Sequence, residues 1–406
     1  MKNLESIKQK IEEVEISQSD DDSDSEDSGS DSSESGESSS ADSDINVDLK
    51  VSYHLSQEKA VSMQKIYICH MCGSASTNQV ATAFSDLTSS LYDINGLQHI
   101  RTFEGHQKTI TNIRFNPSDP HQIVSSSTDG TVRFWDIRKA GKSALIFKDD
   151  TAESKQLKPF LSFDISKSGH FLCAGTELFD GDAFLVFGDA RSGKILGGYW
   201  ESHSDDITQV AFHPNLSDSV ASGSADGLIN IYNLKSDNED DALISSLNTE
   251  STIDKLAWYQ IEGAHKGLSC ILDTMEIQLW EDDGVSPYST FSRKHISKST
   301  SWKVDESYVV NVHQAASGDL YVLTGASTKN SEDLAFLHIK DKTLLVETAL
   351  PGNKQRVRCS WYNSENGSLI TAGEGGILSV WKSGTEKGHD NSGKILSKTS
   401  VRSKPY

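Results

Sequence analysis

One short run of residues combines the side chains that bind metals. Cys69-His70-Met71-Cys72 has the spacing of half a zinc site, in which thiolate and imidazole ligands complete a tetrahedron. The run continues an apolar stretch, residues 66–69, that predicts an inner strand, where side chains three apart point to opposite faces. No second Cys/His pair stands nearby in the sequence. We therefore expect packed thiols here, with no bound metal and no cofactor.

Motifs that organise catalytic side chains are missing from the sequence. It contains no Gly-x-Ser-x-Gly elbow, no phosphate-binding loop, no His-Glu-x-x-His pair and no dense Asp/His cluster. Its five cysteines are odd in number and scattered, which is typical of buried thiols in a reducing compartment. The sequence therefore favours a protein that is not an enzyme.

The elements that position the polar side chains are short strands. After Gly105-His106, the residues from Ser125 to Asp136 alternate in a strand pattern around the tight turn at Asp129-Gly130 and end in Trp135-Asp136. Gly-His followed at this distance by Trp-Asp resembles the signature of WD-repeat proteins. In that family each repeat of about 40–45 residues forms one four-stranded blade of a β-propeller.

The resemblance implies a buried relay of hydrogen bonds in this repeat. It would join His106 to Asp129, to the Ser125 hydroxyl and to the Trp135 indole, so that each buried donor has an acceptor. Among the repeats, only this one carries all four residues. We expect the repeats that lack relay residues to be held together more by contacts between aliphatic side chains than by buried hydrogen bonds.

The strand pattern recurs along the chain. Its strand-end anchors are Tyr92, Trp135, Gly188, Tyr232, Trp280 and Trp381. The last and longest interval holds a degenerate repeat at residues 320–324 and 334–339. Residues 50–55 precede the first blade and are expected to supply the outer strand of the last one, which closes the ring. The fold class predicted for residues 45–384 is therefore all-β, a seven-bladed WD-repeat β-propeller.

Three further segments resemble one particular family within the WD-repeat proteins. Residues 182–191, 203–210 and 237–243 are similar to the WD repeat-containing protein 89 family, and the resemblance extends over residues 50–384. It implies the fold. It implies no biochemical activity, because one propeller scaffold carries many unrelated functions.

Two arginines follow the corresponding strand in adjacent repeats. Arg138 ends the sequence Trp-Asp-x-Arg, and Arg191 ends Asp-x-Arg in the next repeat. Substrate receptors of cullin-four ubiquitin ligases resemble this arrangement, which implies that both arginines contact the damaged-DNA-binding adaptor of the ligase. The alternative is structural, because an arginine in this place can pair with a neighbouring carboxylate.

The N-terminal segment differs from the repeats in composition. Residues 1–44 hold 15 of the acidic side chains and 3 lysines, a net charge of −12 out of −21 for the whole chain. Residues 17–44 are almost wholly Ser, Asp, Glu and Gly and are predicted to be disordered. Ser19 and Ser23 each precede an acid by three residues, the pattern that acidophilic kinases phosphorylate.

Shorter features lie at both ends of the chain. An apolar stripe at residues 3–16 predicts a short amphipathic helix, and residues 385–406 form a mildly basic tail. No apolar run approaches the roughly 20 residues of a membrane span, and so acidic a chain repels nucleic acid and anionic lipid. We expect a cytoplasmic or nuclear protein with neither nucleic acid nor membrane as a partner.

These observations indicate a scaffold for protein–protein interaction. We expect a chain that is monomeric by itself and joins a multiprotein complex. Two alternatives remain open: a substrate receptor that binds a ligase adaptor through Arg138 and Arg191, and an escort whose acidic arm, residues 1–44, holds a basic client protein.

Overall fold

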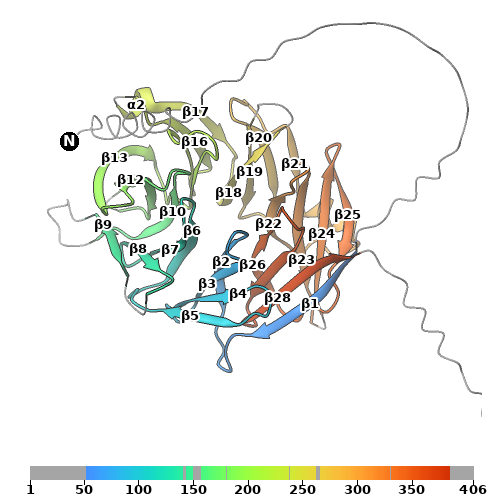
Figure 1. Ribbon diagram of the computed structural model, residues 1–406. Helices are drawn as coiled ribbons and strands as arrows, with labels where there is room; N and C mark the ends of the chain where they lie inside the picture. The colour runs from blue at the N-terminus through green and yellow to red at the C-terminus, as the bar shows by residue number, and fades with distance from the viewer. Residues whose placement is uncertain are drawn as a thin grey trace, which may run out of the picture.

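Seven four-stranded antiparallel sheets surround a central axis in the computed structural model (Figure 1). The structure describes residues 52–139, 143–149, 157–179, 181–236, 238–261, 266–329 and 331–384. The predicted all-β, seven-bladed WD-repeat propeller is confirmed. The acidic arm with Ser19 and Ser23, the short helix expected at 3–16 and the basic tail lie outside the described residues.

In each of the first six blades, four consecutive antiparallel strands follow one another from the axis of the ring outward. Blade 1 is β2 (Ile68–Ser74), β3 (Gln79–Phe84), β4 (Ser89–Asp93) and β5 (His99–Phe103). Blade 2 is β6 (Ile110–Asn116), β7 (Asp119–Ser127), β8 (Thr131–Asp136) and β9 (Leu145–Lys148). Blade 3 is β10 (Phe160–Ile165), β11 (Phe171–Thr176), β12 (Ala183–Asp189) and β13 (Lys194–His203).

Blades 4 to 6 repeat this order, and the predicted degenerate repeat forms blade 6. Blade 4 is β14 (Gln209–Phe212), β15 (Ser219–Gly223), β16 (Leu228–Asn233) and β17 (Leu243–Asn248). Blade 5 is β18 (Ile253–Gln260), β19 (Lys266–Leu272), β20 (Ile277–Glu281) and β21 (Ser289–Phe291). Blade 6 is β22 (Ser307–Gln314), β23 (Leu320–Ser327), β24 (Glu332–Lys340) and β25 (Thr343–Ala349).

The seventh blade joins the two ends of the propeller. Its inner three strands are β26 (Val357–Tyr362), β27 (Leu369–Gly373) and β28 (Ile377–Gly384). The outer strand is β1 (Ser52–Ala60), which pairs antiparallel with β28 in the register Ser52↔Gly384 to Ala60↔Ile377. In Figure 1 the blue first strand therefore lies beside the red last one. The predicted closing strand is confirmed, and it leaves the ring without an open end.

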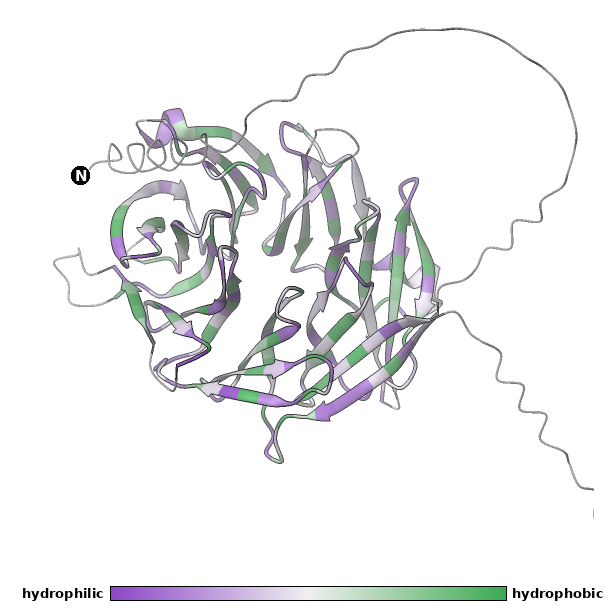
Figure 2. Ribbon diagram, in the orientation of Figure 1, coloured by the Kyte–Doolittle hydropathy of each residue, from purple (hydrophilic) through white to green (hydrophobic). Residues whose placement is uncertain are grey.

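The hydrophobic core lies between the blades. The anchor residues of the third strands face a neighbouring sheet: Trp135 of blade 2 packs in one cluster with Ala81, Leu91 and Phe103 of blade 1. Trp135, Trp280 and Trp381 are each at most 1% exposed. Fully burying side chains of this size stabilises the fold by roughly 1.5–3 kcal/mol each. In Figure 2 the hydrophobic colour is concentrated along the strands.

In the described parts of the chain, two short helices interrupt the strand pattern. α2 (Glu239–Ala242) precedes β17, and its cap is Asn238, whose side chain accepts a hydrogen bond from the Asp241 backbone N–H. α3 (Arg293–Thr300) connects blades 5 and 6, where the outer strand β21 has only three residues. Ile296 of α3 is fully buried in the cluster between these blades.

Candidate functional site

The structure brings His106, Ser125, Asp129 and Trp135 together in one chain of hydrogen bonds. The Trp135 indole N–H donates to Ser125 Oγ over 2.8 Å, and Ser125 Oγ lies 2.8 Å from His106 Nε2. His106 Nδ1 lies 3.0 Å from Asp129 Oδ2. Because the serine accepts from the indole, its own proton goes to Nε2, and the imidazole donates from Nδ1 to the carboxylate.

The Asp129 carboxylate also fixes the turn before β8. It accepts backbone N–H groups from Gln107 and Thr131, each over 2.9 Å. Burial alone would raise the pKa of Asp129, but hydrogen bonds from the side chains of His106 and Thr131 and from the Gln107 backbone hold it well below its usual value. Ser125 is 0% exposed, so this serine, histidine and aspartate cannot reach a substrate. The arrangement therefore stabilises the blade and is not a catalytic triad. We call such a buried set of hydrogen bonds within one blade a lock.

Blade 4 contains a second lock of the same geometry. His203 Nδ1 lies 3.0 Å from Asp226 Oδ2, and its Nε2 lies 2.8 Å from Ser222 Oγ. Tyr232 occupies the tryptophan position, and its hydroxyl accepts a hydrogen bond from the Asn230 side chain instead of reaching the serine. The lock therefore ends at the serine, and the phenol is satisfied separately.

Blade 7 replaces the histidine and aspartate by one glutamine. The Gln355 side-chain oxygen accepts hydrogen bonds from the backbone N–H groups of Gly375 (3.0 Å) and Ile377 (3.2 Å). The Trp381 indole donates to Thr371 Oγ1 over 2.9 Å. The expectation that degenerate blades pack mainly by aliphatic contacts is wrong for this blade, because a different side chain supplies the polar lock.

Blade 3 lacks the tryptophan because a neighbouring blade fills its place. A Cβ added to Gly188 would lie 2.3 Å from the Phe147 ring, which belongs to β9 of blade 2. Phe147 is 1% exposed and stacks on Phe160 with their ring centroids 5.9 Å apart. An aromatic ring from blade 2 thus replaces the one that blade 3 omits.

The cysteine and histidine run lies on the inner strand β2, as its apolar flank predicts. Cys69 and Cys72 are free thiols, and burial raises the pKa of Cys72 to about 12. A thiol that resists ionisation is a poor zinc ligand. Within the described parts of the chain, no group of three His, Cys, Asp or Glu side chains could hold a metal ion.

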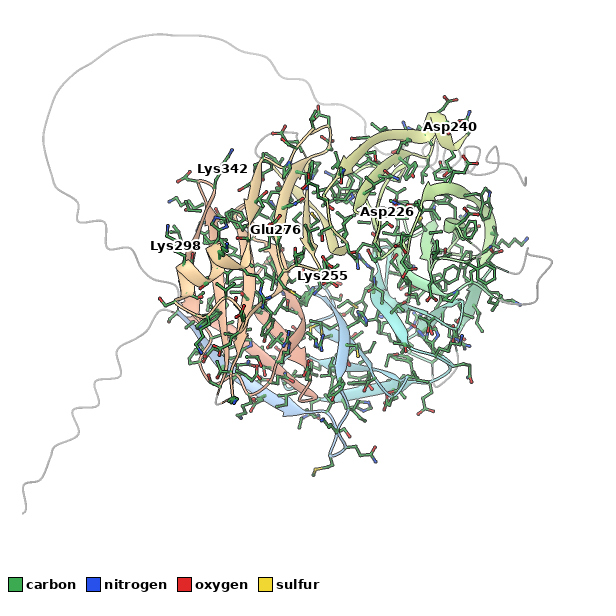
Figure 3. All side chains as sticks on the ribbon, turned by 180° about the vertical axis from the view of Figure 1, so that it is seen from behind. Asp226, Asp240, Lys255, Glu276, Lys298 and Lys342 are labelled. Carbon is green, nitrogen blue, oxygen red and sulfur yellow. The ribbon has the colours of Figure 1, made fainter. Side chains whose placement is uncertain are left out.

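Three inner strands carry a cation and two neutral imidazoles at the axis of the ring. Burial, and secondarily the charge of Lys255, lower the pKa of His70 to about 4 and that of His313 to about 3. The Lys255 ammonium donates to the Val310 carbonyl, and no described carboxylate lies within 4.0 Å of it. Figure 3 shows Lys255 near the centre of the propeller.

An ion pair between a half-buried arginine and a buried aspartate lies on two further inner strands. Arg114 Nη1 of β6 lies 3.1 Å from Asp164 Oδ1 of β10. Burial raises the pKa of Asp164 despite the nearby guanidinium, and its carboxylate also accepts the Phe212 backbone N–H. Sequence reasoning missed these axial groups, since they come from different blades. His70 and Lys255 both follow a register shift in their inner strand, which the structure shows and the sequence pattern does not.

Arg138 and Arg191 lie at corresponding ends of β8 and β12 in adjacent blades. Their side chains are 62% and 55% exposed. Arg138 Nε lies 2.9 Å from Asp136 Oδ1, and Arg191 Nε lies 3.3 Å from Asp189 Oδ1. Each guanidinium thus pairs with the aspartate two residues before it, as in the structural alternative, and still presents an exposed edge.

An exposed aromatic cluster lies on blade 3, and sequence reasoning missed it. We call Phe184, Trp200 and Lys158 the rim cluster. Trp200 is 44% exposed, and its ring packs edge-on against Phe184 with the centroids 5.2 Å apart. The Lys158 ammonium lies 4.6 Å from the Phe184 ring centre and 5.4 Å from that of Trp200.

The backbone beneath the rim cluster is fixed by one carboxylate. Glu239 of α2 accepts hydrogen bonds from the backbone N–H groups of Trp200 (2.7 Å) and Glu201 (3.1 Å). It also accepts the Ser202 hydroxyl over 2.8 Å. The backbone that carries Trp200 is therefore held in place by a residue of α2.

The fold and its locks define a class of protein. Residues 97–136 and 194–233 match the family model described as WD domain, G-beta repeat. These are the two repeats that contain His106 and His203, and each begins with the outer strand of the preceding blade. The chain belongs to the WD-repeat proteins, whose propellers generally serve as platforms for protein interaction and not as catalysts.

Several curated proteins are similar to this chain. WD repeat-containing protein GTS1 of Arabidopsis thaliana is 32% identical over 61% of this chain and 61% of its own length. The WD repeat-containing protein 89 homolog of Dictyostelium discoideum is 23% identical over 76% of this chain and 81% of its own. Pre-mRNA-processing factor 19 of Bos taurus is 25% identical over 46% of this chain and 34% of its own. The chain thus spans less than two thirds of the first and third of these relatives.

Among the described residues, no helix is long and apolar enough to span a membrane.

Proposed function

We propose that this protein is a non-catalytic scaffold that binds another protein through the rim cluster on blade 3. The observation that supports the proposal is Trp200, a large aromatic side chain left 44% exposed beside a second ring and a cation. Tryptophan is the residue most enriched at the energetic centres of protein interfaces.

The geometry favours binding because the segment that carries Trp200 is already ordered in the free protein, which lowers the entropic cost of binding. The Glu239 carboxylate holds the backbone of residues 200–202, so the tryptophan loses little conformational freedom when a partner covers it. Lys158 is paired with Asp149 over 2.9 Å, so its charge is already neutralised, and the exposed part of Trp200 is left to supply the contact energy. The fitting partner is a protein surface that offers an apolar side chain.

Trp200→Ala is expected to weaken binding of the partner by at least 2 kcal/mol, the typical loss at such a centre, or roughly thirtyfold or more in Kd. Affinity purification with quantitative mass spectrometry identifies the proteins retained by the wild type and lost by the variant. Leu216→Ala is the matched control, since Leu216 is a 54% exposed leucine of blade 4. Equal recovery of every partner with Trp200→Ala and Leu216→Ala contradicts the proposal.

A second candidate function is that of a substrate receptor bound to a ubiquitin-ligase adaptor. The supporting observation is the pair Arg138 and Arg191, both exposed at corresponding ends of adjacent blades. Two exposed guanidinium groups at corresponding ends of adjacent blades would bind carboxylates or carbonyls of an adaptor. The aspartate that pairs with each arginine would orient it in the free protein.

The double substitution Arg138→Gln and Arg191→Gln is expected to abolish co-purification of the adaptor while the melting temperature stays close to wild type. Exposed ion pairs contribute at most about 1 kcal/mol to folding, so the fold tolerates their loss. Co-precipitation and thermal melts measure the two effects. Lys139→Gln with Lys194→Gln removes the same charge from exposed lysines near these arginines and is the control. Absence of adaptor in the wild-type precipitate ends this candidate.

A further inference from the structure

The helix α3 and the residues on either side of it form a positively charged segment of the described propeller. Residues 284–304 contain Arg293, Lys294, Lys298 and Lys303 and no Asp or Glu, in a chain whose net charge is −21. Lys294 and Lys298 are exposed and stand four residues apart, on one face of the helix. We call Arg293, Lys294 and Lys298 the α3 basic face.

The positive charges in the first turn of α3 work against the stability of the helix. Its first turn holds Arg293 and Lys294 and no acid, whereas the positive end of a helix dipole favours anions. Lys294 and Lys298 repel each other at a spacing of four. The helix is held instead by the buried side chain of Ile296 and by the Ser299 hydroxyl, which donates to the Leu344 carbonyl over 2.8 Å. Local rules broken in an otherwise consistent fold indicate a functional surface.

The positive charges of this face are not neutralised within the described residues. The Arg293 guanidinium donates to the backbone carbonyls of Asp305 and Ser307, which carry no charge. No described carboxylate lies within 4.0 Å of Lys294 or Lys298, while the neighbouring Lys303 pairs with Glu306 over 3.1 Å. Figure 3 shows Lys298 and Lys342 on the same side of the propeller, and Lys342 stands two residues before Leu344, whose carbonyl accepts the Ser299 hydroxyl of α3.

The described chain begins one blade away from this surface. β25, the outer strand of blade 6, packs against β1 on one side and against α3 on the other. Tyr53 of β1 packs against Phe336 of blade 6 with their ring centroids 5.8 Å apart. Packed sheets lie roughly 10 Å apart, and the residues from 44 to 52 span at most roughly 26–29 Å when extended. Residues 17–44 can therefore reach α3.

The charge of residues 17–44 makes them a suitable binding segment for the α3 basic face. Residues 17–44 contain 11 Asp and Glu and no Lys or Arg. A tethered segment of this length is present near α3 at an effective concentration of order millimolar, so even weak electrostatic attraction is effective. We propose that the acidic arm, residues 17–44, docks in cis on the α3 basic face and withholds it from acidic partners.

Docking would respond to phosphorylation and to salt. Phosphate at Ser19 and Ser23 adds roughly 1.5–2 negative charges per site and strengthens docking. Salt weakens it, because the Debye length falls from about 10 Å at 0.1 M to about 3 Å at 1 M. The docking surface on blades 5 and 6 is distinct from the rim cluster of blade 3, so this proposal does not depend on the proposed function.

The first test is an NMR spectrum of the full ¹⁵N-labelled chain. In the wild type at low salt, the arm resonances are expected to be broadened by attachment to the propeller, and 1 M salt is expected to sharpen them. Lys294→Glu with Lys298→Glu should give the sharpened spectrum already at low salt. Lys108→Glu with Lys194→Glu, a matched pair of exposed lysines elsewhere, should keep the wild-type spectrum. Broadening that survives the α3 substitutions overturns the proposal.

Two controls keep this result decisive. Lys294→Glu places an acid in the first turn of α3, which favours the helix, so loss of docking is not loss of fold. Should the double variant fail to fold, Lys294→Gln with Lys298→Gln takes its place. Labelled chain mixed with excess unlabelled chain separates docking in cis from docking on a second copy: a spectrum that changes with this dilution overturns docking in cis.

The second test locates the arm on the wild-type protein. A carbodiimide joins carboxylates to amines only where they touch, and mass spectrometry identifies the joined peptides. We expect residues 17–44 to be linked to Lys294, Lys298 or Lys342 at low salt and not at 1 M salt. Links to the C-terminal lysines 394, 398 and 404 alone would instead assign the arm to the basic tail and contradict the proposal.

Discussion

Asp129→Ala is expected to destabilise the propeller by about 1–3 kcal/mol, the cost of leaving buried polar groups without a partner. The substitution removes the acceptor of the His106 imidazole and of the backbone N–H groups of Gln107 and Thr131. His106 remains buried, so water does not readily replace the lost carboxylate at its Nδ1, while Trp135 keeps its own acceptor, Ser125 Oγ.

Urea denaturation followed by tryptophan fluorescence measures the loss. Asp283→Ala is the control, because Asp283 is exposed and its removal should change the free energy of unfolding by less than about 0.5 kcal/mol. Gln355→Ala removes the corresponding acceptor of blade 7 and should also destabilise, since two backbone N–H groups lose their partner. A loss with Asp129→Ala no larger than with Asp283→Ala would mean that the relay stabilises nothing.

The same carboxylate predicts how stability depends on pH. The folded pKa of Asp129 lies below its unfolded value of about 3.9, so its contribution is complete above that value. The contribution is lost as the pH falls through the unfolded pKa towards the folded one. Below about pH 4, the wild type should therefore lose more stability than Asp129→Ala, and the two should converge. Parallel pH profiles would contradict this assignment.

The fold could be predicted because its signals are local and repeated. One sequence repeat contains the strand signals of about one blade. The strand pattern and the anchors Trp135, Trp280 and Trp381 can therefore be recognised repeat by repeat. The closing strand β1 was predictable as well, because a ring of seven blades needs an outer strand that only the N-terminal side could supply.

Parts of the candidate site could not be predicted because they join residues that are distant in sequence. The rim cluster needs Glu239 of α2 to fix the backbone at Trp200, and the axial cation Lys255 acts on His70 and His313 from a different blade. The lock of blade 7 was missed for another reason. Gln355 accepts the backbone hydrogen bond at the turn where the WD-repeat motif has an aspartate, and glutamine is not part of that motif.

Restoring the family tryptophan in blade 3 is expected to destabilise this protein. Judged by the sequence pattern alone, Gly188→Trp would restore the tryptophan that the WD repeat normally has at this position. In the structure, the first atom of the new side chain would lie 2.3 Å from the Phe147 ring, far inside van der Waals contact. Phe147 is 1% exposed and stacked on Phe160, so it has no empty space into which to move. We expect a loss of about 1–3 kcal/mol or more from overpacking.

A double-mutant cycle tests whether the two aromatic positions exclude each other. Phe147→Ala alone should cost about 3–5 kcal/mol, because it leaves a cavity where the ring was. In the presence of Phe147→Ala, the tryptophan of Gly188→Trp gains that cavity, so the double variant should be more stable than the sum of the single losses predicts. Leu216→Trp, which adds the same ring at an exposed position, should be close to neutral. Additive losses would mean that Phe147 does not occupy the tryptophan site, and that blade 3 is simply missing its anchor.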